Sequence, residues 1–321
     1  MGLSIIIPTY RNVEFIPELV ESISRNDFNE EYEVLVGIDS CYDTLHYIYE
    51  NQFPSNFKFF FFENKKGPYI IKNTLTELSK FDKLLFFDSD DIMMSNMISE
   101  IHSNLDHYGM IKPKYINFTD QNNSREFKKE GSQFGEGVFG IRKELFLNMN
   151  GFEGWEVAAD SDFMGRFYKT NNTVLHTQSI LFHRRIHDNS LTVHPDTGLS
   201  SRIRGQYHLQ SKRKTSKDIV NEFMIRANYK IVDFETKILA DSNDNIDENY
   251  VTSEQEIKKR QQESISNVLT NKPKIINVNK TPKTINYQVI NSRTNQPISS
   301  QLGKALKKAK LEEIKKGRRK Y

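Results

Sequence analysis

The chain of 321 residues contains little cysteine and no long apolar segment. Its single cysteine, Cys41, excludes an intrachain disulfide, which is typical of proteins from a reducing compartment. No apolar run approaches the roughly 18 residues that a membrane-spanning helix needs. The N-terminus runs directly into an apolar strand and lacks the pattern of a signal peptide. We therefore expect a cytoplasmic protein without a transmembrane segment.

Acidic residues are in excess in the first part of the chain and scarce in the second. Residues 1–199 contain 19 Lys and Arg against 29 Asp and Glu, whereas residues 200–321 contain 26 against 13. This asymmetry predicts two regions with different partners. The basic half suits nucleic acid or an anionic membrane surface, and a solvated tail without a partner is the alternative.

Strand and helix patterns alternate through the first hundred residues. Apolar strands are expected at 3–8, 32–38, 57–62 and 83–87, with helical spacing at 14–25 and 68–80. This alternation predicts an α/β fold with a mostly parallel, Rossmann-like sheet flanked by helices. A hairpin is expected around residues 120–123, and a further helix is expected to begin near residue 160.

Three regions are predicted from the composition. Residues 1–198 form the α/β domain, and residues 199–270 a helical C-terminal extension. That extension includes an amphipathic helix at 218–240, from apolar residues spaced three and four apart, and a second helix at 253–269. Residues 271–321 are expected to be a flexible linker and a basic tail, because they are polar with few apolar residues.

A four-residue apolar run, 84–87, leads directly into three carboxylates, Asp88, Asp90 and Asp91. Burying ionised carboxylates is costly unless something compensates their charge. We therefore expect them just past the end of a strand, where α/β sheets bind ligands, holding a divalent cation such as Mg²⁺ or Mn²⁺. The alternative is a solvated acidic turn.

The order of several motifs resembles that of family 2 glycosyltransferases, which have the GT-A fold, over about residues 1–195. The first strand and turn, residues 5–12, and the second strand with its acidic end, residues 34–43, are similar to the nucleotide-contacting segments of that family. Residues 63–67 followed by Lys72-Asn73, and then Asp88-Ser89-Asp90-Asp91, match its next two motifs. Residues 137–152 resemble the segment before its catalytic acids. Two positions depart from the pattern: Ala159 replaces an acidic residue, and Ile38-Asp39-Ser40-Cys41 stands where the family has Asp-Asp-Gly-Ser.

The resemblance implies an inverting transfer of a sugar from a nucleotide donor, expected to be a UDP-sugar, to an acceptor hydroxyl. Asp160 would be the catalytic base. The metal ligands would be Asp88, Asp90 and His187. Contacts to the nucleotide-sugar are expected from Pro8, Thr9, Tyr10, Asp39, Lys72, Asn73, Asp88, Ser89 and Arg184.

The residue types suit this chemistry. A cation held by carboxylates would neutralise the charge that grows on a diphosphate leaving group. Asp39 could accept the imide proton of uracil, and Asp160 the proton of the attacking hydroxyl. Structural alternatives stay open: Asp39 and Asp160 as helix caps, Lys72 as an exposed helix lysine, and the aromatic rings of Phe152 and Trp155 either in the core or as a sugar platform.

The acceptor is expected to be a glycan or a hydroxylated base in DNA. One alternative function is a nucleotidyltransferase of activated-sugar synthesis. The turn Thr9-Tyr10-Arg11-Asn12 argues against it, because that turn lacks glycine. The other alternative is a non-catalytic module that binds nucleotide-sugars, which the retained carboxylates disfavour.

Overall fold

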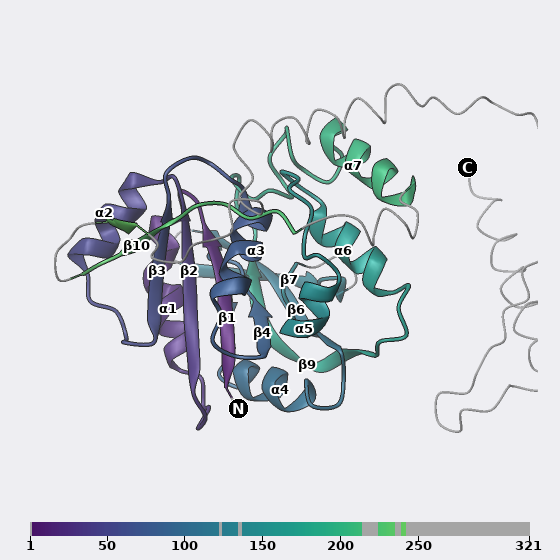
Figure 1. The fold of residues 1–321 in the computed structure, drawn as a ribbon, viewed down its shortest axis with the longest axis horizontal. Helices are drawn as coiled ribbons and strands as arrows, with labels where there is room; N and C mark the ends of the chain where they lie inside the picture. Colours follow the sequence, from purple (N-terminus) through teal and green to yellow (C-terminus); the bar gives the residue numbers. More distant parts are fainter. Residues whose placement is uncertain (1, 122–123, 134–136, 214–223, 235–238, 242–321) are drawn as a thin grey trace, which may run out of the picture. The chain divides into compact units, whose positions relative to one another are not determined.

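The central element of the protein is one mixed β-sheet. The computed structural model describes residues 2–121, 124–133, 137–213, 224–234 and 239–241. Within this part of the chain, eleven strands form the sheet, in the order β11-β10-β3-β2-β1-β4-β8-β6-β9-β5, with β7 paired to β6 (Figure 1). The α/β fold expected from the sequence is confirmed.

Four strands make the parallel half of the sheet. β1 (Leu3–Thr9) lies between β2 (Tyr32–Asp39) and β4 (Lys83–Phe86), and β3 (Phe57–Phe62) lies outside β2. The pairs β1–β2, β1–β4 and β2–β3 are all parallel. The carboxyl ends of these strands therefore share one edge of the sheet, where the acidic residues that follow β2 and β4 come together.

The other half of the sheet contains both strand directions. It comprises β5 (Ile92–Met93), β6 (Met110–Gln121), β7 (Ser124–Glu130), β8 (Phe139–Arg142) and β9 (Val174–Arg185). Strand β8 is antiparallel to β4 and β6, and β6 is parallel to β9. The predicted hairpin is present as the antiparallel pair β6–β7.

Helices cover both faces of the sheet. One hydrophobic core contains side chains of α1 (Ile16–Ser24), α2 (Tyr42–Glu50) and α4 (Met97–Asn104), and a short 3-10 turn (Val13–Phe15) precedes α1. The second core contains side chains of α3 (Pro68–Leu78), α5 (Lys143–Asn148) and α6 (Ala159–Phe167). Alternate residues of β1 enter the two cores, as the two-residue period of a strand requires: Ile5 and Ile7 enter the first, and Ile6 the second.

The predicted helix at 218–240 is wrong for its described part. Helix α7 (Arg202–Arg213) lies in the expected extension, but residues 224–234 run extended, with β10 (Lys230–Val232) antiparallel to β3 and to β11 (Leu239–Asp241). The apolar residues of this segment pack against α3 instead. Ile225 and Ala227 are buried there, and the Ala227 N–H donates to Thr74 Oγ1. Strand β10 also covers an edge of β3 that would otherwise be unpaired.

Several sequence predictions lie outside the described residues, namely the helix at 253–269 and the linker and basic tail at 271–321. Among the helices that the structure describes, none is long and apolar enough to cross a membrane.

Candidate active site

The acidic turn after β4 is held in place by an arginine from β9. The Arg185 backbone N–H donates to Asp91 Oδ1 at 2.9 Å, and its Nε donates to the Asp90 carbonyl oxygen at 2.8 Å. Its other guanidinium nitrogens pair with Glu18 and Asp120. Arg185 is 5% exposed, so this turn is fixed by a buried side chain. Asp91 therefore supports the turn, and Asp88 and Asp90 are the carboxylates that stay partly exposed.

Lys72 and Asp88 form an ion pair between α3 and this turn. The distance from Lys72 Nζ to Asp88 Oδ1 is 2.8 Å, and the lysine side chain is only 4% exposed. The alternative of an exposed helix lysine is therefore wrong. Because Asp88 retains 37% exposure, its carboxylate remains open to solvent beside a fixed positive charge.

Asp90 lies next to His187, which the family resemblance predicted as a metal ligand together with it. The distance from His187 Nε2 to Asp90 Oδ2 is 2.9 Å, and both side chains are about one fifth exposed. A carboxylate oxygen and an imidazole nitrogen are a suitable donor pair for a transition metal such as Mn²⁺. No cluster of three or more His, Cys, Asp or Glu side chains that could hold a metal occurs in the described ranges. The pair can thus supply two ligands, and phosphate oxygens and water would complete the shell.

Asp39 ends β2 and holds the turn before α3. Its two carboxylate oxygens accept the backbone N–H groups of Lys66 and Gly67, at 2.7 and 2.9 Å. Asp39 does not cap the helix that follows it, α2, whose N-cap residue is Cys41. Burial raises the pKa of the Asp39 carboxyl, and the two hydrogen bonds and the nearby lysines offset part of this rise.

Asp160 lies in the first turn of α6. The helix is capped at Ala158, so Asp160 is not its N-cap, although Asp160 Oδ1 accepts the Ser161 N–H at 2.7 Å. Burial raises the pKa of the Tyr69 hydroxyl of α3, and the charge of Asp160 raises it further. Gly137 faces the same carboxylate, because a Cβ at that position would lie 3.1 Å from Asp160 Oδ2.

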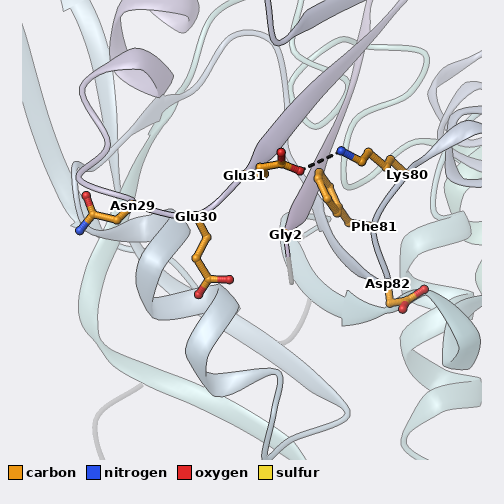
Figure 2. Close-up of a pocket in the computed structure, with 7 residues that line it drawn as sticks. All are labelled: Gly2, Asn29, Glu30, Glu31, Lys80, Phe81 and Asp82. Carbon is orange, nitrogen blue, oxygen red and sulfur yellow. Dashed lines mark hydrogen bonds and ion pairs between the residues drawn. The ribbon is translucent and has the colours of Figure 1, made fainter.

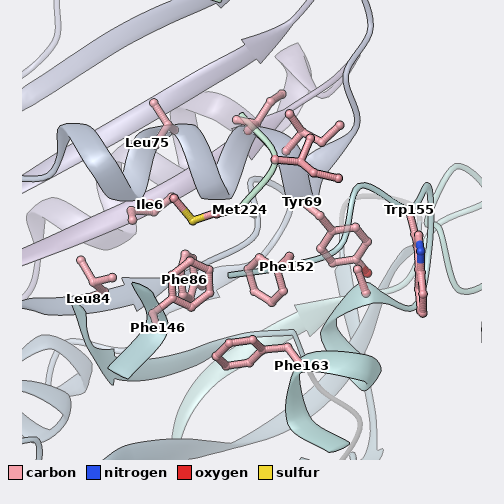
Figure 3. Close-up of a cluster of buried hydrophobic side chains, with 14 of the residues drawn as sticks. Ile6, Tyr69, Leu75, Leu84, Phe86, Phe146, Phe152, Trp155, Phe163 and Met224 are labelled. Atoms are coloured by element: carbon pink, nitrogen blue, oxygen red, sulfur yellow. The ribbon is translucent and has the colours of Figure 1, made fainter. Parts of the chain in front are cut away.

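Asn73 does not face the candidate site, which corrects its expected role as a donor contact. It is fully buried, and its side-chain amide bonds three backbone groups: the Phe152 N–H and carbonyl oxygen and the Ile225 carbonyl oxygen, at 2.8 to 2.9 Å. Asn73 therefore connects α3 to the segments at 152 and 225. Phe152 and Trp155 are buried in the core, and the Trp155 ring stacks on Tyr207, so neither is a sugar platform (Figure 3).

Arg184, a predicted contact to the nucleotide-sugar, interacts with residues outside the acidic turn. Its Nη2 donates to Thr192 Oγ1 at 2.9 Å, and its guanidinium lies 6.0 Å from the Tyr115 ring centre, whereas the neighbouring Arg185 makes the contacts to the acidic turn. That Arg184 contacts the donor stays a prediction.

The end of β1 lies beside the acidic turn. Pro8 and Thr9 are buried, and Thr9 Oγ1 has no hydrogen-bond partner within the described part of the chain. The Tyr10 ring lies 4.4 Å from Lys65 Nζ. Ser89 is buried, and its hydroxyl accepts a hydrogen bond of 3.0 Å from the Asn12 side chain. The segments predicted to contact a nucleotide therefore meet at one edge of the sheet.

A pocket of about 450 Å³ lies elsewhere in the protein. Its lining includes Glu30, Glu31, Lys80 and Asp82, with Glu31 and Lys80 ion-paired at 2.8 Å (Figure 2). These residues lie at the amino ends of β1, β2 and β4, whereas α/β sheets bind ligands at the carboxyl ends. This pocket contains none of the residues predicted to act in sugar transfer.

A family model for glycosyl transferase family 2 matches residues 4–189, so the chain belongs to that family of enzymes. Its similarity to individual members is moderate. The poly(ribitol-phosphate) beta-N-acetylglucosaminyltransferase TarS of Staphylococcus aureus is 31% identical over 124 residues, which cover 36% of this chain and 22% of TarS. The match thus spans about a fifth of the length of that relative.

Two further proteins extend the comparison. The GalNAc(5)-diNAcBac-PP-undecaprenol beta-1,3-glucosyltransferase of Campylobacter jejuni is 22% identical over 209 residues, covering 60% of this chain and 67% of that enzyme. The mannosyltransferase PcManGT of Pyrobaculum calidifontis, solved with GDP-Man and Mn²⁺, matches with a TM-score of 0.50 and 14% identity, covering 65% of this chain and 62% of that one. The structural likeness supports the fold.

Proposed function

We propose that the protein transfers a sugar from a UDP-sugar to an acceptor hydroxyl with inversion at the anomeric carbon. One observation carries the proposal: carboxylates from three separate segments lie near the carboxyl ends of the parallel strands. Asp39 binds the turn before α3, Asp88 pairs with Lys72, and Asp160 lies beside Gly137, which precedes the antiparallel partner of β4, strand β8. A donor bound at the carboxyl ends of the parallel strands would lie between the nucleotide-contacting residues and the base.

Asp160 is the proposed general base. It is a partly exposed carboxylate, so it can accept a proton from an acceptor hydroxyl that approaches from solvent. A positioned base typically contributes a factor of about 10²–10⁴ to the rate. The hydroxyl attacks the anomeric carbon as the bond to the diphosphate breaks, which inverts that centre.

The charge of the leaving diphosphate needs a positive partner. A divalent cation held by Asp90 and His187, with Asp88 beside it, would supply that charge as a Lewis acid. Mn²⁺ suits the histidine, and Mg²⁺ suits the carboxylates. Lys72 contributes a fixed positive charge at the same place, buried next to Asp88.

Asp39 is the proposed contact to the uracil ring. Each of its oxygens already accepts one backbone N–H, and a carboxylate oxygen retains a second lone pair that can accept the imide N–H. The unpartnered Thr9 hydroxyl is the other proposed donor contact from this edge.

A glycan is the proposed acceptor. The names of the two sequence relatives specify a poly(ribitol-phosphate) acceptor and a saccharide on undecaprenyl diphosphate, and both names state a beta linkage. Inversion gives that linkage from an alpha-linked donor. A hydroxylated base in DNA and contact with an anionic membrane stay predictions that depend on the basic residues 200–321.

The test is donor binding and turnover with a panel of UDP- and GDP-sugars, in Mn²⁺, Mg²⁺ or EDTA. We expect one preferred UDP-sugar, loss of turnover in EDTA and loss of turnover in Asp90→Ala. The matched control is Asp196→Ala, because that aspartate follows His187 by nine residues and its side chain is 88% exposed. Absence of binding to every nucleotide-sugar, with either metal, would refute the proposal.

A further inference from the structure

Arg204 of α7 is a buried charged residue that the proposed reaction does not use. It is only 6% exposed, and burying a charged group is costly unless hydrogen bonds compensate it. Its Nε donates to the Thr197 carbonyl oxygen at 3.0 Å, and its Nη2 donates to the Leu191 carbonyl oxygen at 3.1 Å. Both acceptors belong to the connection between β9 and α7, residues 186–201, which also contains His187.

The start of this connection is a tight turn around His187. The His187 N–H donates to Ser190 Oγ at 3.2 Å, and the Ser190 N–H donates to the His187 carbonyl oxygen at 3.0 Å. Ser190 is buried, so these bonds have little competition from water. Leu191, whose carbonyl oxygen binds Arg204, comes directly after this turn. A displacement of the backbone at Leu191 would therefore be transmitted to His187.

The rest of the connection depends on similar bonds for its position. Residues 186–201 are all described, and they form turns without a helix or a strand. The Leu199 N–H donates to the Thr192 carbonyl oxygen at 3.2 Å, and Arg184 Nη2 donates to Thr192 Oγ1 at 2.9 Å. A connection of this kind has no ladder of backbone bonds to a neighbouring strand, so side chains from the adjacent elements decide where it lies.

His187 has to keep a defined position if it is to bind a metal together with Asp90. Its Nε2 lies 2.9 Å from Asp90 Oδ2, and its ring centre lies 5.1 Å from that of Phe15. Two ligands bind a cation well only when the protein holds both at the right separation. Residues that orient metal ligands without touching the metal typically contribute about ten- to a hundredfold to metal affinity.

We propose that Arg204 is a positioning residue for the metal site, holding the connection 186–201 so that the His187 imidazole stays beside Asp90. This inference rests on the proposed function, because it assumes the metal that this function requires. The geometry calls for arginine, because two donors of one planar guanidinium reach two different carbonyl oxygens, of Thr197 and Leu191. A lysine at this position would keep the charge but has a single nitrogen.

The test measures Mn²⁺ binding to the full chain saturated with UDP, by electron paramagnetic resonance of the free ion. We expect Arg204→Met to weaken Mn²⁺ binding about ten- to a hundredfold, and Arg204→Lys, which is the milder change, to weaken it less. The matched control is Arg202→Met, because Arg202 is an exposed arginine of the same helix, and its affinity for Mn²⁺ should equal that of the wild type. Unchanged Mn²⁺ binding in Arg204→Met would overturn the inference.

A double-mutant cycle separates positioning from a general loss of structure. If Arg204 acts through His187, then Arg204→Met should weaken Mn²⁺ binding no further in a chain that already carries His187→Ala. A further loss as large as that in the wild-type background would mean that Arg204 supports the fold as a whole, and would overturn the inference.

A last measurement needs neither metal nor turnover. Nitrogen-15 NMR of labelled histidine follows the His187 ring, identified as the signals missing in His187→Ala. We expect these signals to shift in Arg204→Met and to stay in place in Arg202→Met, and unmoved signals in Arg204→Met would contradict the inference. A wild type that binds no Mn²⁺ in the presence of UDP would instead refute the metal requirement of the proposed function, and the ring signals would still decide whether Arg204 positions His187.

Discussion

Removing Lys72 and removing Asp88, which form an ion pair, should lower the free energy of unfolding by different amounts. The Lys72 side chain is 4% exposed, whereas Asp88 is 37% exposed. In Asp88→Asn, a buried ammonium loses its opposite charge and has little access to water. In Lys72→Met, the remaining carboxylate is solvated in place, and the methionine fills most of the volume of the lysine stem.

The magnitudes follow from the two exposures. Removing one partner of a fully buried pair costs about 3–5 kcal/mol. We expect about 2–4 kcal/mol of unfolding free energy to be lost in Asp88→Asn, since the pair is buried on one side only. Lys72→Met should cost about 1 kcal/mol or less, because an exposed carboxylate depends little on its partner.

Urea unfolding of the two variants measures this difference, provided that the slope m stays constant. The control is Glu31→Gln, which removes a partner of Lys80 from an ion pair of the same length, 2.8 Å, with side chains 60% and 75% exposed. That change should cost less than about 0.5 kcal/mol. Equal losses in Asp88→Asn and Lys72→Met, or a larger loss in Lys72→Met, would refute the reasoning from burial.

Three further substitutions, one of them with a matched control, test other parts of the protein. Asp39→Asn should reduce the preference of the protein for UDP over CDP in a binding assay, because cytosine has no imide N–H; an unchanged preference would remove Asp39 from base recognition. Burial raises the pKa of the Asp39 carboxyl above its ordinary value of 3.8, so the folded protein binds this proton more tightly than the unfolded chain does. The resulting stabilisation is fully present below pH 3.8 and is lost as the pH rises through the pKa of the folded state. The free energy of unfolding, measured as a function of pH, should therefore have a less negative slope above pH 3.8 in Asp39→Asn than in the wild type. Asn73→Ala should cost about 2–4 kcal/mol in urea unfolding, since it leaves buried backbone groups unpaired; a smaller loss would mean that water replaces the amide. Gly137→Ala should lower kcat severalfold by pressing on Asp160, whereas Gly165→Ala, with no atom within 4 Å of the added Cβ, should leave kcat unchanged.

The parallel half of the sheet was predictable because its signals are local. Each strand is a short apolar run, and the helix at 68–80 shows its own spacing, so β1 to β4 and α3 lie within a few residues of their expected bounds. Helix α2 was not predicted. The acidic turn was predictable for the same reason, because its carboxylates directly follow an apolar run in the sequence. The segment at 224–234 was not predictable in this way, because its apolar residues are spaced for contact with α3 and β3, which are far away in sequence. Apolar residues spaced three and four apart indicate that one side of a segment is buried. Whether that segment forms a helix or a strand depends on the part of the protein against which it packs.

The roles of individual site residues show the same limit. Motif order placed Asp39, Asp88 and Asp160 at one edge of the sheet, but it did not distinguish Lys72, whose ammonium enters the site, from the neighbouring Asn73, whose amide is directed to the backbone of other segments. Adjacent residues on a helix point about 100° apart, so a two-residue motif necessarily combines a site contact with a packing contact.

Helix α3 explains why these particular positions matter together. Its preceding turn is bound by Asp39, and its second turn carries the cation beside Asp88. Gly37 of β2 lets it approach the sheet closely, because a Cβ there would lie 2.3 Å from an Ile71 methyl carbon. A shift of this one helix would therefore move the contacts to both carboxylates at once. For this reason we expect substitutions that loosen its packing, such as Asn73→Ala, to reduce donor binding and turnover together.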